Sequence, residues 1–296
     1  MAEITRQRTG ELLRRLFEIL KQAPDGLPAM EALTALESAV TLTTYEAGDY
    51  PSGGRRFEKI VRFATVDCVK AGWLQKNKGR WSLTDAGWSA YQLYKDPGQF
   101  YSEAAKLYRL WKAAQPPTGD ESEVEDEGSS EKNASITYEM AEEQAWVEVE
   151  ACFKKMPPYE FQELVADLLR AMSYEVSWIA PPGKDGGIDI IALTDALGTR
   201  PPRIKVQVKR QQQAATVDVV RSFMAVLGEN DVGVFVSLGG FTKDAEFEAR
   251  TQEKRRITLI DLERLFDLWV KHYSTLTDEA RQRLPLKPIH FLAPTP

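Results

Sequence analysis

Residues 183–210, GKDGGIDIIALTDALGTRPPRIKVQVKR, constrain the fold more strongly than any other stretch of the chain. The run 188–192 is apolar apart from Asp189 and is typical of a strand. A second strand is expected at 204–210, after a connection rich in Gly and Pro. Because side chains alternate along a strand, the second strand has an apolar and a polar face. The polar face consists of Lys205, Gln207 and Lys209. The sequence therefore predicts a β-hairpin that places an acid, an amide and a lysine at one edge.

This combination of side chains suits the hydrolysis of a phosphodiester bond. The carboxylate of Asp189 and the amide oxygen of Gln207 are hard donors for a divalent cation, and the backbone carbonyl of Val208 is a further one. A lysine beside such a cation can orient or deprotonate the attacking water. We therefore expect Asp189, Gln207 and Val208 to hold the metal and Lys209 to act on the water.

The motif D-G-G-x-D at 185–189, followed by Q-x-K at 207–209, resembles the Mrr-type restriction endonucleases of the PD-(D/E)xK nuclease superfamily. The resemblance extends over roughly residues 150–270 and includes three flanking stretches, 161–176, 233–249 and 257–265. It implies an α/β, restriction-endonuclease-like domain with a mixed sheet. It also implies a Mg²⁺ cofactor, with Mn²⁺ as an alternative, and cleavage of foreign or modified double-stranded DNA in a restriction system for antiviral defence.

Gln207 departs from the superfamily pattern, because most members have Glu or Asp at this position. An amide brings no negative charge, so metal affinity is expected to be lower and dependence on Glu163 greater. Glu163 belongs to a helix expected at 161–169, at the edge of its apolar stripe, where it would reach the metal directly or through water. An ordinary exposed helix acid is the alternative. Asp185 is expected to stabilise the glycine turn rather than to bind metal.

The acidic residues gather in one segment between two neutral or basic regions. The chain of 296 residues has a net charge of −6, but residues 116–150 carry 12 acidic side chains and 1 basic one. Residues 1–115 carry 17 basic and 13 acidic side chains, and residues 151–296 carry 20 and 19. This length and charge pattern predict two domains, at 1–115 and 146–296, joined by an acidic flexible linker at 116–145.

The linker prediction depends on composition. Residues 116–135 have almost no apolar content and so cannot offset the entropy lost on ordering. A spacer is one interpretation, and the alternative is a DNA mimic that occupies a basic groove until DNA displaces it. A helix leading into the second domain is expected at 136–156, with Trp146, Val149 and Phe153 on one stripe.

The first 115 residues predict three helices followed by a hairpin. Helices are expected at 4–23, 28–40 and 55–71, and two short strands flank the turn Asn77-Lys78-Gly79. This order predicts a winged helix-turn-helix, and the stretch 72–87 is similar to the N-terminal domain that accompanies Mrr-type catalytic domains.

In such a fold the third helix enters the major groove and the wing contacts the DNA backbone. The expected DNA contacts are Arg55, Arg56, Lys59 and Arg62 of the helix, with Lys76, Lys78 and Arg80 of the wing. A solvated basic face on a protein-binding domain is the alternative.

The remaining features exclude several protein classes. Two cysteines exclude a disulfide framework, and no apolar run approaches the ~20 residues needed to cross a bilayer. The N-terminus lacks the apolar core of a signal peptide, so a cytoplasmic protein is predicted. Cleavage of both DNA strands suggests a homodimer or larger even assembly. Two other functions stay open, a nuclease effector gated by a partner or messenger, and a non-catalytic DNA-binding regulator.

Overall fold

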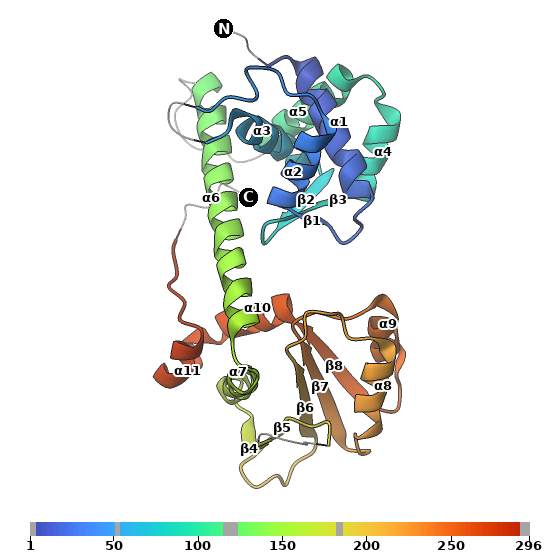
Figure 1. The fold of residues 1–296 in the computed structure, drawn as a ribbon, viewed down its shortest axis with the longest axis vertical. Coiled ribbons are helices and arrows are strands. Elements are labelled where there is room, and N and C mark those ends of the chain that lie inside the picture. The colour runs from blue at the N-terminus through green and yellow to red at the C-terminus, as the bar shows by residue number, and fades with distance from the viewer. Residues whose placement is uncertain (1–3, 51–53, 115–123, 182–185, 291–296) are drawn as a thin grey trace. The chain divides into compact units, whose positions relative to one another are not determined.

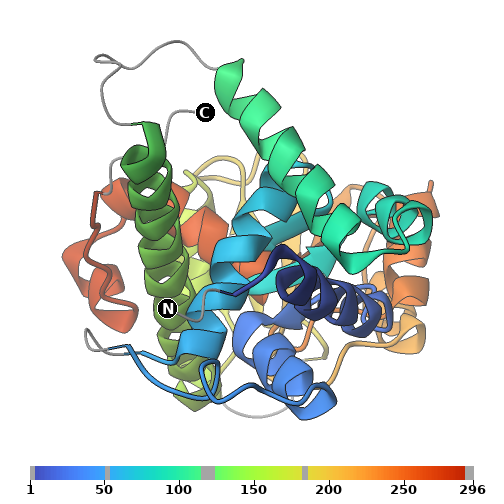
Figure 2. The same cartoon turned by 90° about the horizontal axis from the view of Figure 1, so that it is seen from above.

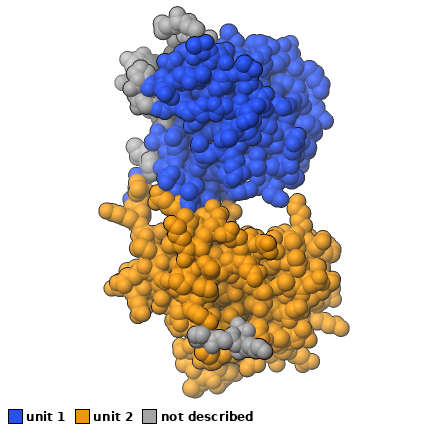
Figure 3. Space-filling model, viewed as in Figure 1, with its two compact units in different colours: residues 1–147, 290–296 blue, residues 148–289 orange. Residues whose placement is uncertain are grey.

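A computed structural model describes residues 4–50, 54–114, 124–181 and 186–290. The chain divides into two compact units, the first comprising residues 1–147 together with 290–296 and the second residues 148–289 (Figure 3). The division falls within helix α6 (Val124–Lys155), which continues from the first unit into the second. Within the described ranges, no helix is long and apolar enough to span a membrane.

The first unit contains helices followed by a hairpin, in the predicted order. Its elements before α6 are α1 (Arg6–Lys21), β1 (Leu27–Pro28), α2 (Ala29–Ala39), α3 (Arg56–Lys70), β2 (Leu74–Asn77), β3 (Arg80–Leu83), α4 (Asp85–Leu93) and α5 (Pro97–Ala113). The three strands form an antiparallel sheet in the order β1-β3-β2. Lys78 and Gly79 both have positive φ, 45° and 72°, and make the tight turn of the hairpin.

The apolar stripes of the helices form the core of this unit. Helix α1 starts at Thr5, whose side chain accepts a hydrogen bond from the backbone N–H of Arg8. Its leucines and Phe17 are buried, and the Phe17 ring meets Phe100 of α5 edge to face at 5.2 Å. Trp81 of β3 is fully buried in the same core, so the hairpin is anchored to the helices.

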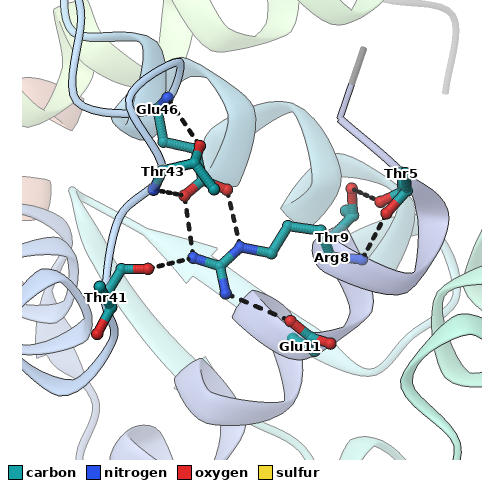
Figure 4. Close-up of polar contacts among 7 residues, drawn as sticks. All are labelled: Thr5, Arg8, Thr9, Glu11, Thr41, Thr43 and Glu46. Carbon is teal, nitrogen blue, oxygen red and sulfur yellow. Dashed lines mark hydrogen bonds and ion pairs between the residues drawn. The ribbon is translucent and has the colours of Figure 1, made fainter. Parts of the chain in front are cut away.

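A buried ion pair fastens the connection between α2 and α3 to α1 (Figure 4). Glu46, with 2% of its surface exposed, accepts hydrogen bonds from Arg8 Nε at 2.8 Å and Arg8 Nη2 at 2.9 Å. The same Nη2 donates to the Thr41 carbonyl at 2.7 Å, and the Thr43 N–H donates to Glu46 at 2.8 Å. The hydrogen bonds from Arg8 lower the pKa of Glu46. This network fixes the start of the connection that leads to α3.

The segment expected to be a flexible linker is largely helical. Residues 115–123 lie outside the described part, but α6 begins at Val124, well before the expected helix start at 136. Composition favoured disorder because like charges repel. In the folded unit, however, Ile136 packs against Val66 and Tyr108, and Lys132 forms an ion pair with Asp67 at 2.6 Å. Tertiary contacts therefore stabilise a helix that its local sequence disfavours.

The second unit is a mixed α/β domain, as predicted. Its elements after α6 are α7 (Pro158–Ala171), β4 (Glu175–Ile179), β5 (Ile190–Leu193), β6 (Arg203–Lys209), α8 (Val217–Ala225), β7 (Asp231–Ser237), α9 (Lys243–Thr251), β8 (Arg256–Asp261), α10 (Leu262–Lys271), a 3-10 turn η1 (Tyr273–Thr275) and α11 (Asp278–Arg283). The sheet has the order β4-β5-β6-β7-β8. The pairings of β4 with β5 and of β5 with β6 are antiparallel, and the other two are parallel.

Helices cover both faces of this sheet (Figure 1). Helices α7 and α10 lie on one face, where they enclose an apolar cavity of about 240 Å³ with Val232, Val234 and other sheet residues. Helices α8 and α9 lie on the other face, where Phe223 of α8 meets Phe235 of β7 edge to face at 5.5 Å. Alternation along β7 thus gives each face its own apolar set.

Candidate functional site

Asp189 lies immediately before β5 and is held by both neighbouring strands. Its backbone N–H donates to the Val206 carbonyl at 2.8 Å, and its carbonyl accepts from the Ala180 N–H at 2.8 Å. Its carboxylate oxygen Oδ2 accepts a hydrogen bond of 2.7 Å from the Val208 N–H. These contacts to both neighbouring strands fix where the carboxylate points.

Gln207 lies in β6, next to the strand that Asp189 precedes. Ile190 pairs with Val206, so Asp189 and Gln207 each lie one residue beyond the last register pair of the two strands. The Gln207 Oε1 atom is buried and has no hydrogen-bond partner among the described residues. A Cβ at Gly187, whose φ is +83°, would approach Gln207 Nε2 to 3.7 Å, so the glycine turn lies against this amide.

Lys209 ends β6 on the same alternating face as Gln207 and is half-buried. Its register partner in β7 is Ser237, and its carbonyl accepts a hydrogen bond of 3.0 Å from the Leu238 N–H. The parallel pairing with β7 therefore fixes the main chain from which the Lys209 ammonium extends.

A polar pocket of about 190 Å³ opens beside Asp189 and Val208. Its other walls come from α7, the end of β4 and Arg210. The Arg210 guanidinium donates to the carbonyls of Lys154 and Met156, at 2.9 and 3.1 Å, and so ties the C-terminal end of α6 to the rim of the pocket.

Helix α7 brings Gln162, not Glu163, to this pocket. Gln162 is 6% exposed, and its Nε2 donates to the carbonyls of Ala180 at 2.9 Å and Asp189 at 3.4 Å. The structure does not bring Glu163 to the described lining of the pocket. Its side chain is 39% exposed, and its carboxylate lies 4.0 Å from the Arg170 guanidinium. The sequence contained a signal for Gln162, because an amide directly after Phe161 falls within the buried stripe of the helix.

The oxygen atoms at this site fit a divalent cation, but only one of the donor groups is charged. Asp189, Gln207 and the Val208 carbonyl are hard donors, and the unpartnered Gln207 Oε1 is an acceptor that a cation would satisfy. Among the described residues, no three His, Cys, Asp or Glu side chains are grouped so that they could hold a metal. Asp185 lies outside the described residues. The donor set therefore suits weak binding of a hard cation such as Mg²⁺.

Arg62, expected to contact DNA, is instead buried against α6. Its surface is 2% exposed, Nη1 donates to Glu139 at 2.8 Å, and Nη2 donates to Glu143 at 2.7 Å. Lys76 is also paired there, donating to Glu139 at 2.6 Å and to Thr65 Oγ1 at 2.8 Å. Arg62 and Lys76, which the sequence predicted to face DNA, are therefore covered by α6 in this structure.

The other expected DNA contacts also have partners within the first unit. Arg55 forms ion pairs with Glu37 and Glu58, and Arg80 donates to the Gly26 carbonyl at 2.7 Å. Arg56, Lys59 and Lys78 lie over the rings of Tyr45, Tyr50 and Trp146, at 4.7, 4.9 and 5.4 Å from the ring centres. Arg55, Lys59 and Arg80 stay exposed.

Comparison with known proteins bears on the second unit. The Mrr_cat family model, described as a restriction endonuclease, matches residues 153–269. A solved structure described as MspJI restriction endonuclease in complex with a 27-mer oligonucleotide is 17% identical, with a TM-score of 0.33. That match covers 69% of this chain and 47% of the other, so the chain spans about half the length of MspJI. No curated protein matched the chain.

The mixed sheet, the position of Asp189 beside the Q-x-K strand and the match to the family model agree with one another. Residues 153–269 therefore form a restriction endonuclease domain of the Mrr type, as the sequence predicted.

Proposed function

We propose that the chain is a DNA endonuclease that depends on Mg²⁺, with Mn²⁺ as an alternative ion. The observation that carries this proposal is the Asp189 carboxylate, fixed by the Val208 N–H beside an unpartnered Gln207 oxygen in a restriction endonuclease domain. Asp189, Gln207 and the Val208 carbonyl would hold the ion. When bound, the ion supplies charge neutralisation at the phosphate and a more acidic water.

The protein's own residues orient the reaction. The Lys209 ammonium donates hydrogen bonds through Nζ to the attacking water and to the phosphate oxygens, whose charge rises in the transition state. Gln162 acts as a positioning residue, because its amide holds the backbone of Asp189 and Ala180 together. Arg210 donates a hydrogen bond to the C-terminal end of α6 and forms part of one wall of the pocket.

The first unit is proposed to be a winged-helix DNA-binding domain. Support comes from the element order α1, β1, α2, α3, β2, β3 and from the sheet order β1-β3-β2. In this interpretation α3 is the recognition helix and the β2–β3 hairpin is the wing. The protein would act in the cytoplasm, as a homodimer or larger even assembly, on foreign or modified double-stranded DNA, and so serve in antiviral defence.

Cleavage of supercoiled plasmid in Mg²⁺ or in EDTA tests this function. Asp189→Ala and Lys209→Ala should each lower the rate by about 100-fold or more, as expected when a group that stabilises the transition state is lost. The exposed residues Asp278 and Lys271 supply matched controls, since their alanine variants should cleave like the parent. Nicking at the parent rate by either site variant would exclude the proposed site.

A second candidate function is a nuclease gated by a small anionic ligand. The first unit has a cavity of about 370 Å³ whose lining includes Arg6, Lys59, Tyr50 and Tyr101. Two cations beside aromatic rings suit a ligand that carries both a phosphate and a planar ring. Plasmid cleavage that starts only when nucleotides are added would favour this function over the first.

A further inference from the structure

Helix α6 lies along the face of the first unit formed by α3 and the β2–β3 hairpin (Figures 1 and 2). We call this surface the α3–hairpin face and define it by Arg62, Lys76, Lys78 and Trp81. Glu139 lies at its centre and accepts from Arg62 at 2.8 Å, Lys76 at 2.6 Å and Trp81 Nε1 at 2.9 Å. One carboxylate of α6 thus binds donors from α3 and from both strands of the hairpin.

Glu143, one turn further along α6, completes the contact. It accepts from Arg62 at 2.7 Å and lies against the hairpin turn, where a Cβ at Gly79 would come within 2.9 Å of its Cγ. The side chains of Glu139 and Glu143 are 10% and 11% exposed, and that of Arg62 is 3% exposed. The contact is therefore a nearly dry network of charges, not a loose surface pairing.

The α6 residues that make this contact form one helical stripe. Lys132, Ile136, Glu139 and Glu143 follow one another at spacings of four, three and four. Ile136 is the apolar member of this stripe, and it packs against Val66 and Tyr108. Lys132 pairs with Asp67 of α3, whereas Glu139 and Glu143 are the two anions of the stripe and pair with cations of the face. The contacts made by these two carboxylates can be exchanged for another anion.

A nucleic-acid backbone offers the same chemistry as these two carboxylates. Arginine and lysine bind carboxylate and phosphate oxygens with the same donors at similar distances. One set of donors cannot serve both partners at once. Moreover, replacing a buried ion pair with well-packed apolar residues is often neutral or stabilising, so such pairs are weak evidence for a purely structural role.

We propose that the α3–hairpin face is a DNA-phosphate-binding surface and that α6 is its internal competitor, so that DNA binds there only when α6 leaves. This inference rests on the proposed function, because it takes DNA as the substrate. It differs from the DNA mimic expected at 116–135, since the carboxylates that cover the face are Glu139 and Glu143. The same helix ends at Lys154 and Lys155, where Arg210 of the Asp189 pocket holds it.

The test measures duplex DNA binding by the full chain in an Asp189→Ala background, which prevents cleavage during the assay. Glu139→Gln with Glu143→Gln removes both carboxylates from the face. Glu148→Gln with Glu150→Gln makes the same change in charge on the same helix, beyond the last residue of the stripe. If the face is open in fewer than about one molecule in ten, the first pair should tighten binding about tenfold or more. The control pair should have no such effect.

A reversible lock tests the same inference without removing charge. Val66 of α3 and Ile136 of α6 belong to one apolar cluster. Both are changed to cysteine in a chain whose native Cys68 and Cys152 are replaced by Ala. Oxidation of the two new cysteines would then link α6 to α3. The oxidised protein should bind DNA about tenfold or more weakly than the reduced one. The single Val66→Cys variant should bind equally in both states. In the single Ile136→Cys variant, the rate of modification by a thiol reagent reports whether α6 has left the face.

Two results would overturn the inference. The first concerns the Glu139→Gln, Glu143→Gln protein. If Ile136→Cys added to this protein reacts with the thiol reagent, α6 has left the face, and an unchanged DNA affinity would then contradict the inference. The other is equal binding by the oxidised and reduced lock. Plasmid cleavage by the parent is measured separately. A parent that cleaves while α6 has no effect on binding refutes this inference alone, whereas a parent that never cleaves refutes the proposed function.

Discussion

Glu139→Gln removes the central carboxylate of the α3–hairpin face, and its effect on stability can be estimated from the structure. Arg62 keeps Glu143 as a partner, but Lys76 loses its ion pair and keeps as acceptors on this face Thr65 Oγ1 and the single amide oxygen of the new glutamine, which Trp81 Nε1 shares. The Lys76 side chain is 12% exposed, so water replaces little of what is lost. Breaking a buried pair by removing one partner costs about 3–5 kcal/mol.

This loss should appear as a lower midpoint of thermal unfolding. At about 2–4 °C per kcal/mol for a unit of this size, the midpoint should fall by roughly 6–20 °C. The loss cannot exceed the free energy with which α6 docks, because undocking returns Lys76 to water. A value near the lower limit would therefore mean that α6 is held weakly, as the internal-competitor proposal requires.

The variant's stability should also depend on pH with a defined sign. Burial lowers the pKa of Lys76, and Glu139 opposes this effect. Without Glu139 the pKa falls further, so between it and the ordinary value of 10.5 the unfolded chain binds more protons than the folded one. Stability of the variant should therefore rise as pH increases through this window.

The assay is urea unfolding of the parent and of Glu139→Gln, followed by tryptophan fluorescence at about pH 7 and about pH 9.5. The variant should recover part of its loss at the higher pH. Adding Lys76→Met should recover it at both values, since an apolar side chain leaves no unpaired charge. Equal losses at both pH values, together with no rescue by Lys76→Met, would refute the assignment of the loss to a buried Lys76.

Three further predictions concern the restriction endonuclease unit. Gln207→Glu should keep cleavage activity and lower the Mg²⁺ concentration needed for half-maximal rate, because it restores a charge. Gln207→Ala should lose activity. The same Mg²⁺ dependence in Gln207→Glu as in the parent would show that the amide does not hold the ion. Gln162→Ala should lower the cleavage rate by about 10- to 100-fold, comparable with the loss of an orienting hydrogen bond, whereas Glu163→Ala should cleave like the parent. A larger loss of cleavage rate in Glu163→Ala than in Gln162→Ala would return Glu163 to the site. Asp231 has a side chain 4% exposed, and although burial acts in the opposite direction, hydrogen bonds from Lys205, the Gly228 N–H and Arg203 lower its pKa. The contribution of Asp231 to stability is therefore fully present above its unfolded-state pKa near 3.8, and it is lost as pH falls through its lowered folded-state pKa. Asp231→Asn should thus cost about 1–3 kcal/mol of unfolding free energy at neutral pH and make stability less dependent on pH in the acid range.

Local periodicity was sufficient to predict the elements that carry the candidate active site. Alternation along 204–210 placed Ile204 and Val206 on a buried face and Gln207 on the polar one, and the structure pairs this strand with β5, which begins directly after Asp189. The stripe of α1 and the Lys78–Gly79 turn were equally legible, because each depends on residues close together in the sequence. Such features follow from side-chain spacing and from backbone conformations that few residues adopt.

Periodicity alone did not place the polar residue of α7 correctly. Gln162 and Glu163 are neighbours on a helix and point in directions about 100° apart. The sequence of α7 allows its apolar stripe to be drawn with either residue at the edge. Only the packing of α7 on β4 and β5 decides which of the two faces the sheet. The buried amide that bonds the Asp189 carbonyl shows which choice the fold makes.

The burial of Arg62 depends on a residue 77 positions away, which no local pattern reveals. Basic side chains on α3 and the hairpin and acidic side chains on α6 were both visible in the sequence. The basic ones were expected to contact DNA and the acidic ones to belong to a flexible linker or, in the alternative, to a DNA mimic. Their association is favoured because each set offsets the repulsion within the other, and ordering α6 also buries Ile136.

The candidate active site and the covered α3–hairpin face share a physical property that bears on control of the nuclease. At the candidate site, β6 and α7 each place an amide next to Asp189, so the proposed cation would be attracted by one carboxylate. On the first unit, the cations best placed for a DNA backbone are neutralised by Glu139 and Glu143. On the two proposals, each arrangement lowers the affinity of the resting protein for something the proposed reaction needs, the metal in one case and the DNA in the other. Under the two proposals, release of α6 from the face and binding of the metal are therefore separate conditions for cleavage, and each can be changed without the other, at Glu139 and at Gln207.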